Sequence, residues 1–446
     1  YEMSASLVGS EMCIRDSADF VFAFRRALNP GTGSDLGRTL TCIANGQQVL
    51  DGQADPSELG VTAVDSKTLK IDLAYSYEDF PKLMASSAAM PCNEKFFTES
   101  QGQYGLEAGT TLGNGPYTFS TSYSWTHGES ISLSRNSLYA GEQKPVPAGI
   151  SFTIGAEIMN GANAIANGTV DAAPITGEQL EAAHAADMNL TSFEDTALGV
   201  CFNMQDSVFQ NANIRSAFLK TLNREQVLSS LPENYSQAQS VIPPQTTLSG
   251  ENYRTLAGEC SLPAYEQGQG KAYLEAGLNE LQLDSLPKVT ILCLDSPGAK
   301  AIVNNLLENW NSALGYYLNL NAVSENELQS ALRNGNYQLA LCPLRADNDG
   351  PWELLNLFSS ENPYNPAGYQ NQDYNNLLSQ IKASPGEDGA ALCLQAENHL
   401  IQNLVFYPLV YEKRYFASAQ NVTGIIFHPY NGGIDFIGAE KTEAEA

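Results

Sequence analysis

The fold of this chain is decided by residues 288–344, which read KVTILCLDSPGAKAIVNNLLENWNSALGYYLNLNAVSENELQSALRNGNYQLALCPL. Three apolar runs typical of strands alternate here with two stretches whose apolar residues recur at helical spacing. Strands are predicted at 289–294, 317–323 and 337–344, and helices at 301–314 and 324–332. Ser324 and Glu327 have the spacing of a capping box, which marks the start of the second helix. This alternation predicts a parallel sheet with right-handed crossovers, and hence an α/β fold.

Shorter patterns flank this region on both sides. Apolar residues at helical spacing predict helices there, and alternating apolar residues predict strands. Helices are expected at 18–28, 79–85, 158–166, 214–222, 373–381 and 389–402, a hairpin at 60–73, and strands at 150–154 and 405–411. Residues 231–263 are rich in Pro, Ser, Gly and Gln, so we expect a domain boundary or a long surface loop there.

The composition excludes several classes of protein. Acidic residues number 50 and basic residues 23 among 446, which gives a formal charge of −27. Phosphate neutralisation needs clustered Lys and Arg, so this balance argues against a nucleic-acid binder. Hydrophobic residues make up 43% of the chain, which is enough for packed cores and excludes a mostly disordered chain. The class of protein that is left is a large acidic protein that binds a neutral or cationic ligand.

The sequence contains no recognisable catalytic or metal-binding motif. Its four histidines, His127, His184, His399 and His428, stand alone, and neither an HExxH helix nor a GxSxG elbow is present. The eight cysteines lie too far apart for a CxxC or zinc-knuckle spacing, so we expect most of them to be buried thiols. We therefore expect a protein that is not an enzyme and that uses no metal and no cofactor.

One loop is a candidate for ligand binding because of its position. Residues 345–352, RADNDGPW, follow the last of the three predicted parallel strands. In open α/β sheets, ligands bind in the crevice outside the carboxyl ends of such strands. A carboxylate placed there can hold a cationic group of a ligand through a charge-assisted hydrogen bond. The alternative is a loop whose Asp residues only cap turns.

Several short segments, taken in order along residues 18–437, resemble the oligopeptide- and dipeptide-binding proteins of bacterial ABC importers, solute-binding protein family 5. No single motif is specific, but their order and spacing are. The segments are ADFVFAFRRALNP at 18–30, LGVTAVD at 59–65, GNGPY at 113–117, RN at 135–136 with Tyr139, NGTVD at 167–171, FN at 202–203 with Phe209, IRSA at 214–217, NRE at 223–225 and AYLEAGL at 272–278.

The resemblance implies a two-lobed periplasmic-binding-protein fold of type II, the flytrap fold, with an extra small domain. The ligand would be buried between the lobes as they close. By this comparison the small domain of the first lobe spans 18–112. The ligand-binding domain of that lobe spans 113–235 and is completed by 412–438. The ligand-binding domain of the second lobe spans 236–411, and 439–446 form a tail.

The resemblance also implies a peptide site. Asp347 aligns with the acid that pairs with the α-amino group of a bound peptide. The expected ligand-binding residues are Asp347, Arg345, Ala346, Asn348, Asn203, Phe202, Asn114, Tyr369 and Trp352. Because peptide importers tolerate many side chains, we expect affinity to come mainly from backbone hydrogen bonds.

The chain departs from the family pattern just before Asp347. Where oligopeptide-binding proteins have a Gly and an aromatic residue, this sequence has Pro343, Leu344 and Arg345. Arg345 is expected either to offset the charge of Asp347 or to reach a carboxylate of the peptide. Tyr369 and Trp352 are expected to line side-chain pockets or, alternatively, to pack beneath the loop.

The implied function is to capture peptides outside the cytoplasm for the permease subunits of an ABC importer. The alternatives are a peptide or pheromone sensor, or a binder of nickel, haem or sugars on the same scaffold. An extracellular hydrolase is disfavoured, because the sequence shows no nucleophile or acid–base set. We expect a monomer, located in the periplasm or on the cell surface as a lipoprotein. It would bind no nucleic acid, and would reach a membrane only through a lipid anchor that this chain has lost.

Residues 1–17 are expected to be non-native. The string SLVGSEMCIRDS at 6–17 looks like a translated sequencing adaptor. Family members carry a signal peptide and a further part of the first lobe before the segment that matches 18–30. Missing strands would leave an exposed sheet edge, so we expect this chain to fold poorly or to aggregate. A cooperative thermal transition together with peptide binding would contradict that expectation.

Overall fold

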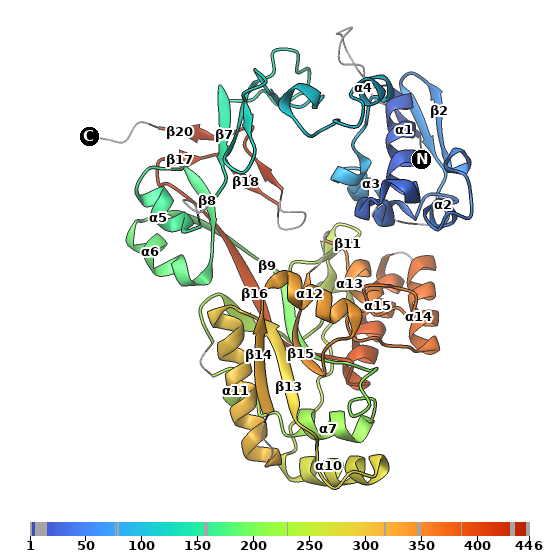
Figure 1. Ribbon diagram of the computed structural model, residues 1–446, viewed down its shortest axis with the longest axis vertical. Coiled ribbons are helices and arrows are strands. Elements are labelled where there is room, and N and C mark those ends of the chain that lie inside the picture. Colours follow the sequence, from blue (N-terminus) through green and yellow to red (C-terminus); the bar gives the residue numbers. More distant parts are fainter. Residues whose placement is uncertain are drawn as a thin grey trace. The chain divides into compact units, whose positions relative to one another are not determined.

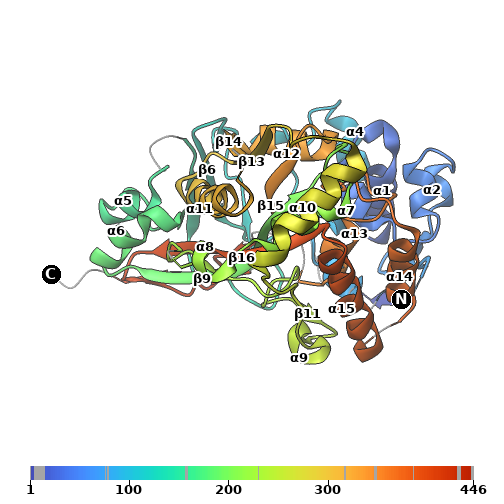
Figure 2. The same cartoon turned by 90° about the horizontal axis from the view of Figure 1, so that it is seen from below.

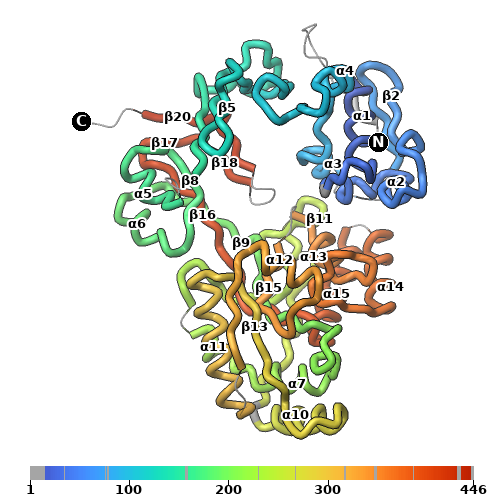
Figure 3. Tube along the Cα trace, in the orientation of Figure 1, coloured from blue at the N-terminus to red at the C-terminus, as the bar shows by residue number. Residues whose placement is uncertain are grey.

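The computed structural model describes residues 2–4, 16–75, 77, 80–155, 159–229, 231–315, 318–345, 349–384, 386–428 and 433–442. The chain divides into two compact units, which are described separately (Figure 1). The first unit is formed by residues 1–191 and 415–446, and the second unit by residues 192–414. The chain leaves the first unit within strand β9 (Asn189–Phe202) and returns to it within β16 (Phe406–Ser418) (Figure 3).

The sheet of the second unit contains the predicted parallel strands. β13 (Val289–Leu294) pairs in parallel with both β14 (Leu318–Val323) and β15 (Leu339–Arg345), so the predicted β-α-β-α-β order is confirmed. Beyond β15 the sheet continues through β9, β16 and β10 (Tyr235–Gln237), and β9 runs antiparallel to β15. The sheet therefore changes from parallel to antiparallel pairing at β15.

Helices pack against the sheet of the second unit and form a large apolar core with it. The crossovers are α11 (Pro297–Leu314) and α12 (Glu325–Asn334). Trp310 of α11 is fully buried, and its Nε1 donates a hydrogen bond to Phe218 O of α7 (Ala212–Lys220) at 2.8 Å. Helix α10 (Gln267–Leu281) packs along α7 (Figure 2). Burial of these apolar faces is the main favourable term in folding this unit.

The remaining elements of the second unit are shorter or lie near its carboxyl end. The helices are α8 (Arg224–Val227), α9 (Tyr253–Ala257), α13 (Trp352–Asn356), α14 (Gln372–Ala383) and α15 (Gly386–Gln402), and the strands are β11 (Thr247–Leu248) and β12 (Glu251–Asn252).

The capping box predicted at Ser324 is confirmed, and it allows a test. Ser324 Oγ accepts a hydrogen bond from Glu327 N at 3.4 Å, and Glu327 Oε2 accepts one from Ser324 N at 3.0 Å. Ser324→Ala removes the side-chain acceptor that caps α12, so we expect the free energy of unfolding to fall by about 1 kcal/mol. Urea unfolding curves measure the change. Ser285→Ala, at an exposed site, is the control, and equal shifts in both variants would deny the cap a specific contribution.

Among its described residues, the first unit has two apolar cores that are separate from each other. One forms around α1 (Ser17–Leu28) and the hairpin of β2 (Val61–Asp65) and β3 (Thr68–Ile71), which confirms the predicted helix and hairpin. The other forms around α5 (Gly161–Ala166) and includes Ala417 of β16. The strand register explains this second core, because β8 (Ala172–Ile175) pairs with the last four residues of β16.

The other elements of the first unit are short. The helices are α2 (Gly46–Leu50), α3 (Phe80–Leu83), α4 (Glu94–Glu99) and α6 (Leu180–Ala185). The strands are β1 (Glu2–Ser4), β4 (Tyr117–Thr118), β5 (Trp125–Thr126), β6 (Ser130–Arg135), β7 (Gly149–Thr153), β17 (Val422–Thr423), β18 (Ile426–Phe427), β19 (Ile434–Asp435) and β20 (Glu440–Lys441).

The boundary between the units differs from the predicted one. The sequence placed the change of lobe at 235/236, whereas the structure places it at 191/192 and the return at 414/415 instead of 411/412. The reason is packing, because residues 192–235 supply β9 and α7 to the core of the second unit. For the same reason, residues 231–263 lie inside the second unit and are not a boundary.

Both ends of the described chain also differ from expectation. Helix α1 begins at Ser17, and the Asp16 side chain caps it by accepting from Ala18 N at 2.9 Å and Asp19 N at 3.2 Å. The predicted helix began one residue later, at Ala18. Near the other end, the predicted tail contributes β20, which pairs with β17, so its first residues are not frayed.

The described cysteines agree with the sequence-based expectation of buried thiols. The seven described cysteines are free thiols, and all but Cys260 are buried. Within the described residues, no helix combines the length and the apolar character that a membrane crossing requires.

Candidate functional site

The candidate site lies at the carboxyl end of β15. Arg345 is the last residue of that strand and pairs across the sheet with Thr196 of β9. The parallel neighbour β13 ends at the same edge of the sheet. The first crossover leads from β13 to β14 on one side of it, and the second leads to β15 on its other side, so the strand order reverses between β13 and β15. The carboxyl ends of strands at such a reversal are where an open α/β sheet binds its ligands.

A buried carboxylate and two arginines occupy this edge. Asp195 of β9 is completely buried. Arg414 of β16 binds it through two donors, with Nε donating to Oδ1 at 2.9 Å and the terminal nitrogen donating to Oδ2. Thr196 Oγ1 donates to the same Oδ1 at 3.1 Å. Arg345 approaches from the other side, with its Nε 3.7 Å from Asp195 Oδ2. Asp195 thus links three neighbouring strands of the sheet.

The loop after Arg345 is held on both sides of its centre. Ala346, Asp347 and Asn348, all expected to bind ligand, lie outside the described residues. The description resumes at Asp349, whose carbonyl oxygen accepts from Thr247 N at 2.6 Å and whose carboxylate accepts from Thr247 Oγ1. The three residues therefore lie between an anchor at Asp195 and an anchor at Thr247.

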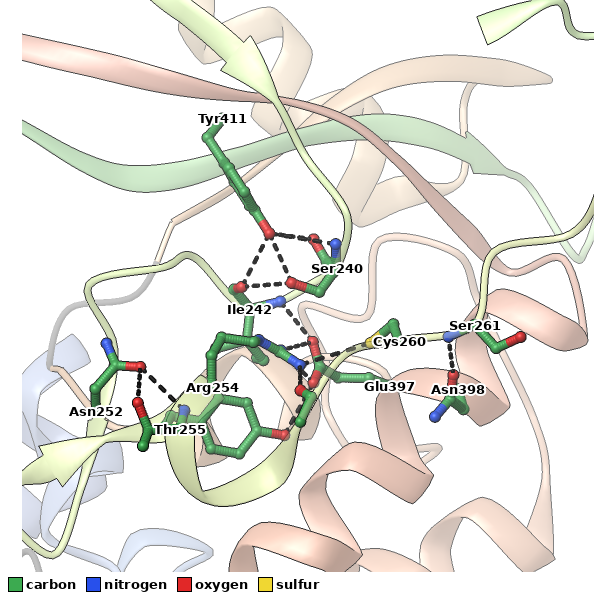
Figure 4. Close-up of polar contacts among 12 residues, drawn as sticks. Ser240, Ile242, Asn252, Arg254, Thr255, Cys260, Ser261, Glu397, Asn398 and Tyr411 are labelled. Carbon is green, nitrogen blue, oxygen red and sulfur yellow. Dashed lines mark hydrogen bonds and ion pairs between the residues drawn. The ribbon is translucent and has the colours of Figure 1, made fainter.

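A buried network fixes the segment that carries Thr247. Glu397 of α15 is completely buried, and its carboxylate accepts hydrogen bonds from Ile242 N at 2.8 Å and from Tyr253 OH at 2.9 Å. Arg254 donates to both oxygens of the same carboxylate (Figure 4). Hydrogen bonds to the Glu397 carboxylate therefore hold residues 242–254 against helix α15.

The same network extends to β16 and to the site. Tyr411 OH lies 2.6 Å from Ser240 Oγ and accepts from Ser240 N at 3.2 Å (Figure 4). Gln245 Oε1, from the same segment, accepts from Glu194 N at 3.0 Å, one residue before Asp195. Residues 240–254 therefore support both sides of the candidate site.

Protonation in this network is fixed by burial and by charge. Burial alone lowers the pKa of the Arg254 guanidinium, but the Glu397 carboxylate more than offsets it, and the pKa is raised above its ordinary value. Burial raises the pKa of Tyr411 to about 12. At neutral pH the arginine is therefore charged, and the tyrosine keeps the proton that it donates.

Two predicted ligand residues lie at the end of β9 away from Arg345. In the register of β9 with β15, Phe202 pairs with Leu339, whereas Thr196 pairs with Arg345. Phe202 is completely buried in the core of the second unit. The buried Asn203 donates hydrogen bonds from its amide Nδ2 to Gly335 O at 2.9 Å and to Tyr337 O at 2.7 Å. The structure therefore does not bring these two residues together with Arg345, and their role as ligand residues stays a prediction.

The other predicted ligand residues have different surroundings. Tyr369 is 5% exposed and its OH lies 2.8 Å from His399 Nε2, and its role as a ligand residue stays a prediction. Trp352 begins α13 half-buried, with Lys382 Nζ 4.9 Å from the centre of its ring. Asn114 is half-buried just before β4, in the first unit. Its role as a ligand residue stays a prediction.

Sequence reasoning missed the two residues on which the geometry of the site depends. Asp195 and Arg414 are 219 positions apart, and neither belongs to a local motif that would have indicated the pair. Two arginines of the quoted segments also have a structural explanation. Arg215 NH1 donates to Phe209 O at 2.6 Å, and Arg224 NH2 donates to Leu409 O at 2.9 Å. Both arginines bind carbonyl groups in the second unit, and burial lowers the pKa of both.

Comparison with known proteins identifies the family. The profile described as "Bacterial extracellular solute-binding proteins, family 5 Middle" matches residues 16–366. The chain belongs to this family. Among curated relatives of this solute-binding protein, the dipeptide-binding protein DppE of Bacillus subtilis is 26% identical over 434 residues, or 95% of this chain and 78% of the relative. The oligopeptide-binding protein OppA of the same organism is 25% identical over 430 residues, or 94% of this chain and 77% of the relative.

Solved structures agree with this assignment at the level of the fold. The solute-binding protein matches the substrate-binding domain of an oligopeptide ABC transporter from Bacillus anthracis with a TM-score of 0.77 and 22% identity, covering 96% of this chain and 84% of the other. It matches Listeria monocytogenes OppA bound to peptide with a TM-score of 0.75 and 21% identity, at the same coverage. The predicted two-lobed α/β fold is thereby confirmed.

Proposed function

We propose that this solute-binding protein captures peptides outside the cytoplasm and delivers them to the permease subunits of an ABC importer. The observation that carries the proposal is its similarity, over 95% of its length, to a dipeptide-binding protein. A second relative over nearly the same span is an oligopeptide-binding protein. The protein binds its ligand as a monomer without transforming it, and no cofactor takes part.

The site at the end of β15 is the proposed peptide site. In this proposal Asp347 pairs with the α-amino group of the peptide, as the resemblance to the family implies. The defined partners of the residues on either side support the proposal, because Arg345 pairs with Thr196 in the sheet and Asp349 is bound by Thr247.

A competition experiment tests the proposed function. The purified chain is mixed with a library of di- to pentapeptides, nickel, haem and a panel of sugars, and the retained ligand is identified by native mass spectrometry. We expect peptide adducts and no others. Retention of nickel, haem or a sugar without any peptide would contradict the proposal and favour another ligand on the same scaffold.

The role of Asp347 is tested by changing the amino terminus of the ligand. Asp347→Ala should weaken binding of a peptide with a free amino terminus by about 2–5 kcal/mol, because the ammonium group is left buried without its partner. The N-acetylated form of the same peptide should lose almost nothing. Calorimetric titration of both peptides measures the difference, with Asp284→Ala, at an exposed position, as the control. An equal loss for both peptides would remove the assigned role.

A further inference from the structure

The charges at the end of β15 do not balance. The carboxylate of Asp195 carries one negative charge, and the two guanidinium groups of Arg345 and Arg414 carry two positive charges. Within the described residues, this small cluster therefore has one positive charge in excess.

The excess charge belongs to Arg345 and not to Arg414. Arg414 satisfies both carboxylate oxygens of Asp195, and Thr196 adds a third hydrogen bond. Arg345 contributes only a contact of 3.7 Å through Nε, which is longer than a hydrogen bond. Its side chain is 48% exposed, against 30% for Arg414 and 0% for Asp195. Asp195 thus orients the Arg345 side chain, while no hydrogen bond joins the two side chains.

The exposed guanidinium is placed where a ligand binds. Arg345 ends the strand at which the sheet changes from parallel to antiparallel pairing. A guanidinium presents several N–H donors in a planar fork that matches the two oxygens of a carboxylate.

We infer that Arg345, held in place by Asp195, binds a carboxylate of the ligand and thereby sets the ligand class. This inference rests on the proposed function and sharpens it to peptides that present a carboxylate at this edge. The carboxylate has two possible sources, the carboxyl terminus of the peptide and an acidic side chain. Asp195 is a positioning residue in this arrangement, since it acts through Arg345.

The test uses matched peptide libraries that differ only in their carboxylates. The peptides of the first library have free carboxyl termini and contain no acidic residue. The second library is the same set with amidated carboxyl termini. The peptides of the third library are also amidated, and each contains a single Glu, whose position varies from peptide to peptide. Competition between libraries for the wild-type chain, read by native mass spectrometry, should favour one carboxylate-bearing library over the amidated one by about tenfold. Preference for the first library assigns the carboxyl terminus, and preference for the third assigns a side chain.

Arg345→Gln should abolish that preference while peptide binding itself persists. Arg333→Gln is the matched control, because it removes the same charge from an exposed position in the last turn of α12, just before the amino end of β15. It should keep the preference. If Arg345→Gln also keeps the preference for carboxylate-bearing peptides, or if the wild type shows no such preference, the inference is overturned. The proposed function survives in both cases. If no peptide binds to the wild type, the proposed function fails, and the inference fails with it.

Discussion

Glu397→Gln should lower the free energy of unfolding of the second unit by about 3–5 kcal/mol. The wild-type carboxylate is completely buried and receives hydrogen bonds from Arg254, Tyr253 and Ile242. A glutamine keeps one carbonyl acceptor, but it leaves the guanidinium of Arg254, whose side chain is only 12% exposed, without a counter-charge. An uncompensated buried charge costs more than the lost hydrogen bond does.

Urea unfolding followed by tryptophan fluorescence measures this effect, with the buried Trp310 as a reporter in the core of the same unit. Glu275→Gln on α10 removes the same charge from an exposed position and should change the stability by less than about 0.5 kcal/mol. The double variant Glu397→Gln/Arg254→Met removes both charges and should be more stable than Glu397→Gln alone. A double variant no better than the single one would show that the unpaired charge is not the cause.

Asp195→Asn should destabilise the second unit to a similar extent, by about 3–5 kcal/mol. Asparagine keeps one carbonyl acceptor, but it removes the negative charge and one of the two oxygens to which Arg414 donates, at a position where β9, β15 and β16 meet. Arg414→Gln should cost a comparable amount, because the buried carboxylate then keeps only the Thr196 hydroxyl and the distant Arg345. Thermal and urea unfolding of the two variants, beside the exposed control Asp284→Asn, measure both losses.

Arg345→Gln provides the contrast within the same cluster. Because its guanidinium is half-exposed and 3.7 Å from the carboxylate, we expect a loss of less than about 1 kcal/mol. A loss as large as that of Arg414→Gln would show that Arg345 belongs to the structural ion pair. It would then not be available to a ligand.

Much of the fold could be predicted because its signals are local. The helix at 17–28, the hairpin at 61–71 and the three parallel strands each carry an apolar pattern whose period matches the element. The capping box at Ser324 depends on two residues three positions apart, so it too is visible in the sequence. The family was recognisable because the order of several weak motifs along the chain is informative even when each motif alone is not.

The candidate site was only partly predictable, for two physical reasons. Which end of a strand lies near a candidate site is known only from its register with its neighbours, and this register places Phe202 and the following Asn203 at the end of β9 away from Arg345. A buried polar group finds its partner by tertiary packing, so the pairs of Asp195 with Arg414 and of Glu397 with Arg254 join residues far apart in the chain.

The sequence by itself determined the α/β class, the family and the position of the loop that follows β15. These follow from residue spacing within single elements and from the order of those elements. Only the tertiary structure decided where one unit ends and the next begins. It also decided that Arg414 forms the close ion pair with Asp195, whereas Arg345 is more exposed. Both depend on burial and on distances between strands, which the chain acquires only when it packs.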